Sequence, residues 1–155
     1  MLLAQSRHET ALGKEWMSVK ISQLHLSDFM LFQQADFQWS PGINVICGTN
    51  STGKTALIKL MYSLHKSYEQ WNSTETKEAA VNRFSEKLCG VFRPDNGKVG
   101  RLVRRKQGNA QMTASMGYEN GTSIDVNFGN RASKIATLIL PKMEHTASPD
   151  HTAVY

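Results

Sequence analysis

Cysteine and histidine are scarce in this chain of 155 residues. Cys47 and Cys89 are its only cysteines, and they are too few and too scattered for a disulfide framework or a zinc site. The five histidines never fall at the spacing of metal ligands. The sequence therefore excludes the disulfide-stapled and zinc-binding classes, and we expect both cysteines to be small buried hydrophobic residues.

Long apolar runs are also absent. No run approaches the roughly 18 residues that a spanning helix needs, and the opening MLLAQSRHE reaches charge too soon for a secretory signal. The hydrophobic share of 40% and the charged share of 20% are ordinary for globular proteins. We expect a single soluble, cytoplasmic domain with no membrane partner.

Acidic residues are outnumbered, because 18 basic and 13 acidic residues leave a net charge of +5. This balance suits a polyanion without identifying one. Much of the excess lies in one segment that contains Arg101, Arg104, Arg105 and Lys106. These side chains would either contact nucleic-acid phosphates or form a solvated strand face, and the second reading is favoured because charge runs are usually surface.

The first half of the chain predicts strands followed by a loop and a helix. Residues 1–16 show no periodicity and are expected to be a flexible extension, so the domain would span 17–155. Alternation after Val19 predicts a first strand, and residues 35–39 a second. The turn signal Ser40-Pro41-Gly42 precedes INVIC, residues 43–47, whose β-branched run predicts a fully buried central strand.

Two helices are predicted next. Apolar residues recur at helical spacing after Lys54 and predict a helix over 54–66 that completes the segment 17–66. A second helix is predicted over 77–90, with Gly90 as its stop.

Over residues 99–140 the sequence changes to short segments in which apolar and polar residues alternate, and these segments predict antiparallel hairpins. The break Glu119-Asn120-Gly121 is a hairpin signal. Residues 141–155 have no period and are expected to be an irregular tail that stops abruptly. The four expected strands span 99–105, 111–118, 122–128 and 134–140.

One motif carries recognisable chemistry. The run Gly48-Thr49-Asn50-Ser51-Thr52-Gly53-Lys54-Thr55 fits the phosphate-binding pattern G-x-x-x-x-G-K-[ST] without mismatch. The alternative is that a glycine-rich turn matches the phosphate-binding pattern by chance. It is disfavoured because an expected buried strand enters the run and an expected helix leaves it, so backbone N–H groups and the helix N-terminus would converge on a phosphate.

Each residue type in the motif has a predicted task. Gly48 and Gly53 permit close backbone approach, and Lys54 would reach the β- and γ-phosphates of ATP. The Thr55 hydroxyl would bind Mg²⁺ that also contacts phosphate oxygens. The remaining predicted site residues offer mainly backbone: Thr49, Asn50, Ser51, Thr52 and Ala56.

Residues 21–64 resemble the N-terminus of RecF-like, SMC-like and OLD-like ATPases of the ABC class. The resemblance is carried by Phe29, Phe37, Ser40-Pro41-Gly42 and the loop 48–55 with Asn50. It implies an α/β fold: the N-terminal lobe of an ABC-class P-loop NTPase with an antiparallel β-subdomain, which the hairpins over 99–140 match by layout. It also implies that the lobe is incomplete.

The resemblance also shows what the chain lacks. In these ATPases a Walker B aspartate with a following glutamate, a signature motif and a glutamine loop lie toward the C-terminal end. Two segments come nearest to a Walker B motif: ATLIL before Pro141, and SIDVNF, which contains Asp125. Both are interpreted as ordinary strands. The resemblance therefore implies ATP binding without turnover, hydrolysis after completion by a C-terminal ATPase lobe on another chain, and ATP-dependent self-association.

Two other functions remain open. One is a self-sufficient small ATPase or P-loop kinase in which a carboxylate such as Asp125 serves the metal. The other is a DNA-associated protein whose basic hairpins contact phosphates.

Overall fold

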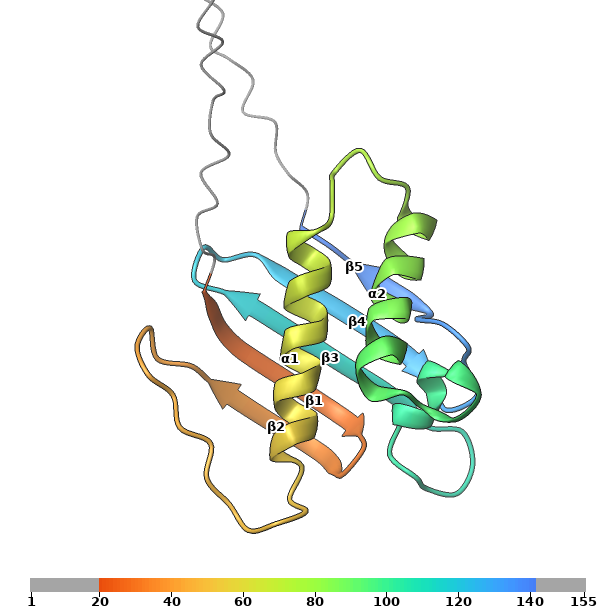
Figure 1. Cartoon of the computed structure of the whole chain (residues 1–155), viewed down its shortest axis with the longest axis horizontal. Helices are drawn as coiled ribbons and strands as arrows, with labels where there is room; N and C mark the ends of the chain where they lie inside the picture. The colour runs from red at the N-terminus through yellow and green to blue at the C-terminus, as the bar shows by residue number, and fades with distance from the viewer. Residues whose placement is uncertain (1–19, 142–155) are drawn as a thin grey trace, which may run out of the picture.

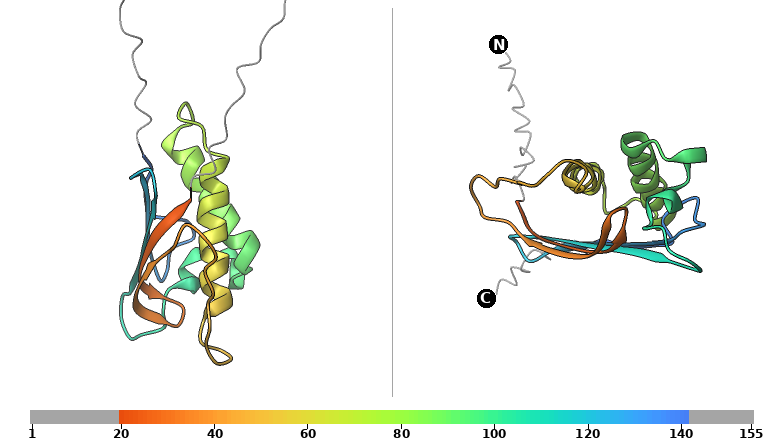
Figure 2. Two further views of the ribbon diagram at one scale, coloured as in Figure 1. Left: turned by 90° about the vertical axis from the view of Figure 1, so that its left-hand side faces the viewer. Right: turned by 90° about the horizontal axis from the view of Figure 1, so that it is seen from below.

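A computed structural model describes residues 20–141, which form a five-stranded antiparallel sheet with two helices on one face (Figure 1). The spatial order of the strands is β2-β1-β3-β4-β5. The strands are β1 (Ile21–Phe29), β2 (Phe32–Gln38), β3 (Gln111–Tyr118), β4 (Ser123–Gly129) and β5 (Thr137–Ile139), and the helices are α1 (Lys54–Glu69) and α2 (Lys77–Phe92). Seen from below in Figure 2, the helices form one layer and the sheet another.

Alternation of buried and exposed side chains along most of β3 and β4 separates the two faces of the sheet. In β4, Ile124, Val126 and Phe128 are buried, and the residues between them are partly exposed. β3 likewise buries Met112 and Met116 on the inner face. Because successive strand residues point to opposite faces, the apolar half of each strand meets the helices and the polar half faces solvent.

Each helix buries one stripe of side chains against this inner face. Leu57, Leu60 and Leu64 of α1 recur at helical spacing and are fully buried. α2 begins at a Thr76 cap, whose side chain accepts from the Ala79 N–H at 3.2 Å. The expected stop at Gly90 is wrong, because Phe92 packs edge-on against Phe29 with ring centroids 5.7 Å apart and carries the helix two residues further.

The hairpin predicted at residues 119–121 is confirmed. β3 and β4 pair antiparallel up to Gly117 and Ser123, and the Tyr118 N–H donates to the Thr122 carbonyl at 2.9 Å. Gly121 has φ of 80°, which glycine adopts without a steric penalty.

The strand predicted over 99–105 is wrong. Two short 3₁₀ turns, Asp95–Gly97 and Val99–Leu102, lead into irregular chain, and Val103 forms only an isolated bridge with Phe29. The segment is held by Gly100, since a Cβ there would lie 2.7 Å from the backbone of Asn130. The last expected strand, 134–140, is shortened to β5.

The buried central strand predicted over 43–47 is also wrong. These residues form no strand and lie in the long connection from β2 to α1, with Ile43 93% and Val45 77% exposed. No neighbouring strand within 20–141 pairs with them, so the β-branched run has nothing to be buried against.

Two expectations fall wholly or largely outside the described residues: the flexible extension 1–16 and the irregular tail 141–155. Within 20–141, no helix combines the length and apolar character needed to cross a membrane.

Candidate nucleotide-binding site

The motif residues 48–53 form a turn that runs directly into α1, at the lower end of that helix in Figure 1. Gly53 stands at the N-cap with φ of 90° and ψ of 4°, a left-handed conformation that L-residues adopt at a cost. Ser51 also has positive φ, 65°. Turns that contain residues of left-handed conformation can aim backbone N–H groups at an anion, so this conformation is compatible with an anion-binding loop.

Both motif glycines are required by packing as well as by backbone angle. A Cβ on Gly53 would lie 2.9 Å from two ring carbons of Phe32. A Cβ on Gly48 would lie 3.1 Å from the Thr52 hydroxyl oxygen and 3.8 Å from Cδ of Lys54. Larger side chains would therefore fill the space that the loop encloses.

The loop is organised around the Lys54 ammonium. Its Nζ donates to the Gly48 carbonyl at 2.7 Å and to the Thr49 carbonyl at 2.5 Å. The Thr52 hydroxyl donates to the same Thr49 carbonyl at 2.9 Å. The lysine is thus folded over the loop, and its ammonium lies against the two loop carbonyls.

The start of α1 favours negative charge. The first intrahelical bond, from the Leu57 N–H to the Gly53 carbonyl, is 2.9 Å long, so the amides of Lys54, Thr55 and Ala56 precede the helical ladder. No acidic residue lies in the first turn, and the cap makes no side-chain hydrogen bond. The dipole of α1, its free N-terminal amides and the Lys54 ammonium all favour the binding of phosphate groups. Thr55 is exposed in the same turn and carries a hydroxyl.

A cavity of about 380 Å³ adjoins the loop and is of a size that small-molecule sites have. Phe32 and Phe37 pack edge-on in its wall with ring centroids 6.2 Å apart, and Phe37 stacks on Trp39 at 5.8 Å. The sequence had suggested Phe37 through a family resemblance but gave no signal for Phe32. The full lining is Phe32, Phe37, Ile46, Cys47, Gly48, Thr49, Thr52, Lys54 and Leu57.

The burial predicted for the cysteines is only partly right. Cys47 is exposed beside the loop, since the strand that would have buried it does not form. Cys89 is half-buried, and burial raises the pKa of its thiol, which donates to the Gly97 carbonyl at 3.2 Å.

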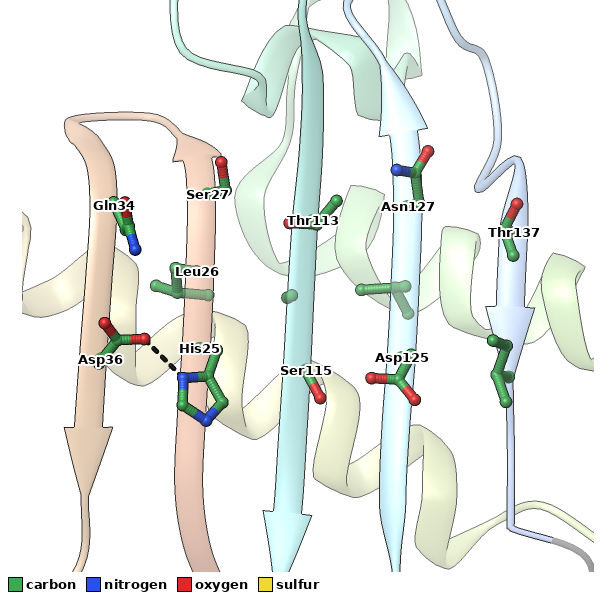
Figure 3. Close-up of a pocket in the computed structure, with 13 residues that line it drawn as sticks. His25, Leu26, Ser27, Gln34, Asp36, Thr113, Ser115, Asp125, Asn127 and Thr137 are labelled. Atoms are coloured by element: carbon green, nitrogen blue, oxygen red, sulfur yellow. Dashed lines mark hydrogen bonds and ion pairs between the residues drawn. The ribbon is translucent and has the colours of Figure 1, made fainter.

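Asp125 is separated from the motif by the sheet. In β4 its neighbours Ile124 and Val126 face the helices, so Asp125 points to the outer face, as Figure 3 shows. There it lines a shallow hollow of about 640 Å³ with the His25–Asp36 pair, whose Nδ1 and Oδ1 atoms are 2.5 Å apart. Among residues 20–141 no three histidine, cysteine or carboxylate side chains are grouped to hold a metal.

The basic segment over residues 101–106 is a solvated surface. Arg101 and Arg105 are exposed, and in the described chain neither forms an ion pair. Lys106 pairs with Asp28, and the Arg104 N–H donates to the Asp28 carbonyl at 2.7 Å. These two contacts fix the segment against β1 and leave the two arginines outward.

Comparisons with known proteins identify the family of the chain. A family model described as an AAA domain matches residues 23–136. The DNA replication and repair protein RecF of Streptococcus equi subsp. zooepidemicus is 27% identical over 99 residues, which are 56% of this chain and 27% of the relative. RecF of Limosilactobacillus reuteri is 34% identical over 77 residues, or 45% of this chain and 21% of the relative.

RecF of Renibacterium salmoninarum is 46% identical over 41 residues, or 26% of this chain and 10% of the relative. The chain therefore spans about a quarter or less of the length of these relatives. No solved structure significantly matches it.

Proposed function

Because the chain belongs to the AAA domain family, an ATPase-type group of P-loop nucleotide-binding domains, we propose that it binds ATP and Mg²⁺ through residues 48–56. The observation that carries the proposal is the loop itself. A glycine in a left-handed conformation delivers the chain into α1, and an ammonium group held by two loop carbonyls stands at the helix N-terminus.

Each site residue has a proposed task. The amides of Thr49, Asn50, Ser51, Thr52 and Ala56 would bind phosphate oxygens, and Gly48 and Gly53 would leave room for them. Lys54 would exchange its bonds to the loop carbonyls for charge-assisted bonds to the β- and γ-phosphates. The Thr55 hydroxyl would contribute one ligand to Mg²⁺, which prefers oxygen and keeps several waters.

We further propose that this chain is the N-terminal lobe of an ABC-class ATPase and binds ATP without hydrolysing it alone. Phosphoryl transfer needs a positioned water and neutralisation of developing charge, and a phosphate cradle by itself supplies little of either. Turnover would follow when a C-terminal ATPase lobe completes the site.

A self-sufficient ATPase or kinase that uses Asp125 is disfavoured by the fold. The carboxylate and the Thr55 hydroxyl lie on opposite sides of the sheet, and a metal ion cannot bridge a packed layer of side chains. ATP-dependent self-association remains a weaker proposal that rests on family resemblance.

DNA binding is a second candidate function. The relatives are named as DNA replication and repair proteins, and the exposed Arg101 and Arg105 offer two cations to a phosphate backbone.

The test of ATP binding is isothermal titration calorimetry of ATP with Mg²⁺ into the full chain and into Lys54→Ala. Charge-assisted hydrogen bonds are worth about 1.5–3 kcal/mol, so we expect a loss of affinity of about tenfold to a hundredfold. Lys59→Ala is the matched control, since Lys59 lies on the same helix with its ammonium 5.8 Å from the Phe92 ring centroid. Equal affinity of the wild type and Lys54→Ala would reject the proposal.

A further inference from the structure

The turn between β1 and β2 has an unfavourable backbone conformation. The two strands are joined by Met30 and Leu31 alone. Met30 has φ of 46°, and Asp28, two residues before it, has φ of 49°. Residues with a side chain adopt such left-handed angles at a cost, so a turn of this kind persists only where its surroundings fix it.

One side of this turn is bonded to the basic segment. The Met30 N–H donates to the Leu102 carbonyl at 2.9 Å. The Arg104 N–H donates to the Asp28 carbonyl at 2.7 Å, and the Lys106 ammonium donates to the carboxylate of the same aspartate, which is buried. Three bonds, one of them an ion pair, therefore fix the position of the turn.

The other side of the turn touches the loop 48–55. Two ring carbons of Phe32 lie 2.9 Å from the position that a Cβ on Gly53 would occupy, and Cδ1 of Leu31 lies 3.8 Å from it. Phe32 also lines the cavity beside the loop, together with Lys54. The turn thus connects the basic segment to the residue that leads the chain into α1, at the lower end of that helix in Figure 1.

Resting on the ATP-binding proposal above, we propose that Asp28 and Lys106 are positioning residues for the loop 48–55. Their ion pair holds the β1–β2 turn so that the Phe32 ring stays against Gly53, and the ring limits the loop to the conformation that binds phosphate. In this arrangement neither residue of the pair touches the nucleotide. Such preorganisation raises affinity, because less order has to be imposed when the ligand binds.

A second ion pair of the chain provides a matched control. Arg83 of α2 pairs with Glu75 at 2.7 Å, and these side chains are 37% and 13% exposed, against 44% and 12% for Lys106 and Asp28. Loss of either cation should therefore cost a similar, modest amount of stability. Arg83 and Glu75 do not line the cavity beside the loop, so only the Lys106 pair should affect nucleotide binding.

The experiment is isothermal titration calorimetry of ATP with Mg²⁺ into full-chain variants. We expect Lys106→Gln to weaken ATP binding about threefold to tenfold, because contact networks modulate the affinity of a site by about this factor. Asp28→Asn should have the same effect, since asparagine tolerates the left-handed conformation but carries no charge. Lys106→Arg keeps the cation and should restore the wild-type affinity, and Arg83→Gln should retain it.

Phe32→Leu tests whether the ring transmits the effect. In that background Lys106→Gln should cause no further loss of ATP affinity, because the contact through which it acts is already gone. An undiminished loss would show that Lys106 acts on the nucleotide directly or through the fold, and would overturn the proposal. Unchanged affinity in Lys106→Gln, or an equal loss in Arg83→Gln, would overturn it as well.

The nuclear magnetic resonance signal of the Gly53 amide separates this inference from the ATP-binding proposal. The Phe32 ring lies against Gly53, so movement of the ring should shift that signal without any nucleotide. We expect a shift in Lys106→Gln and none in Arg83→Gln. A wild type that binds no ATP, with the Gly53 shift present in Lys106→Gln, contradicts the nucleotide site alone. ATP binding by the wild type with an unmoved Gly53 signal in Lys106→Gln contradicts the positioning role alone.

Discussion

The sharpest test of the loop geometry is Gly53→Ala. Gly53 has φ of 90°, and its missing Cβ would lie 2.9 Å from two ring carbons of Phe32. Carbon atoms at rest are about 3.5–4.0 Å apart, so the methyl group cannot be accommodated without movement of the ring or of the loop. The substitution therefore combines backbone strain with a steric contact.

These two costs can be separated by a matched glycine. Strain at an unfavourable positive φ is worth about 1–3 kcal/mol, and overpacking adds about 1–3 kcal/mol. Phe32 is only partly buried and can yield, so we expect Gly53→Ala to lower the free energy of unfolding by about 2–4 kcal/mol. Gly108 has φ of 81° with nothing within 4 Å of its Cβ position, so Gly108→Ala should show the strain alone.

Urea unfolding followed by circular dichroism gives the answer. The set comprises Gly53→Ala, Phe32→Leu and the double variant, and the contact should appear as a coupling energy of about 1–2 kcal/mol in the double-mutant cycle. Additivity within about 0.5 kcal/mol would show that the ring does not press on Gly53. Equal stability of Gly53→Ala and the wild type would refute the left-handed cap as well.

Two further predictions follow from titration and from charge. Burial, and to a lesser extent the neighbouring Tyr68 and Glu69, raises the pKa of Tyr118 far above its usual range. The phenol of the unfolded chain loses its proton above about pH 10, whereas the buried phenol keeps it. The free energy of unfolding should therefore be unaffected below about pH 10 and fall above it, by up to about 1.4 kcal/mol per pH unit. Urea unfolding at pH 8 and pH 11 should show a smaller loss in Tyr118→Phe, and equal losses would contradict the buried phenol. If the chain binds DNA, replacing Arg101 and Arg105 by alanine should lower the salt dependence of log K by about 2 in a fluorescence anisotropy titration; an unchanged slope would exclude these arginines.

Short-range sequence patterns correctly predicted the helix and the hairpin whose formation depends mainly on residues close together in the chain. The helix expected from Lys54 and the hairpin at residues 119–121 depend on short-range periodicity and turn chemistry, and both form. The expected stop at Gly90 failed because a contact between Phe92 and Phe29, distant in sequence, outweighs the helix-breaking tendency of glycine. The expected strand at 99–105 failed for the same kind of reason, since Gly100 packs against the backbone of Asn130.

The motif was visible in the sequence, whereas its surroundings were not. Gly48, Gly53, Lys54 and Thr55 stand at fixed spacing, so their neighbourhood at the foot of α1 follows from the chain alone. Phe32 lies 21 positions before Gly53 and meets it only because β1 and β2 form a tight hairpin under the loop. A contact between residues so far apart in the chain cannot be predicted from sequence periodicity.

The failed strand at 43–47 and the position of Asp125 lead to one argument about activity. A β-branched run predicts burial correctly only if the partner strands belong to the same polypeptide, and here none of the described strands pairs with it. Asp125 faces the outer side of the sheet, whereas the loop 48–55 leads into α1 on the inner side. A carboxylate that served a metal ion at Thr55 would therefore have to approach from the inner side of the sheet, where α1 begins.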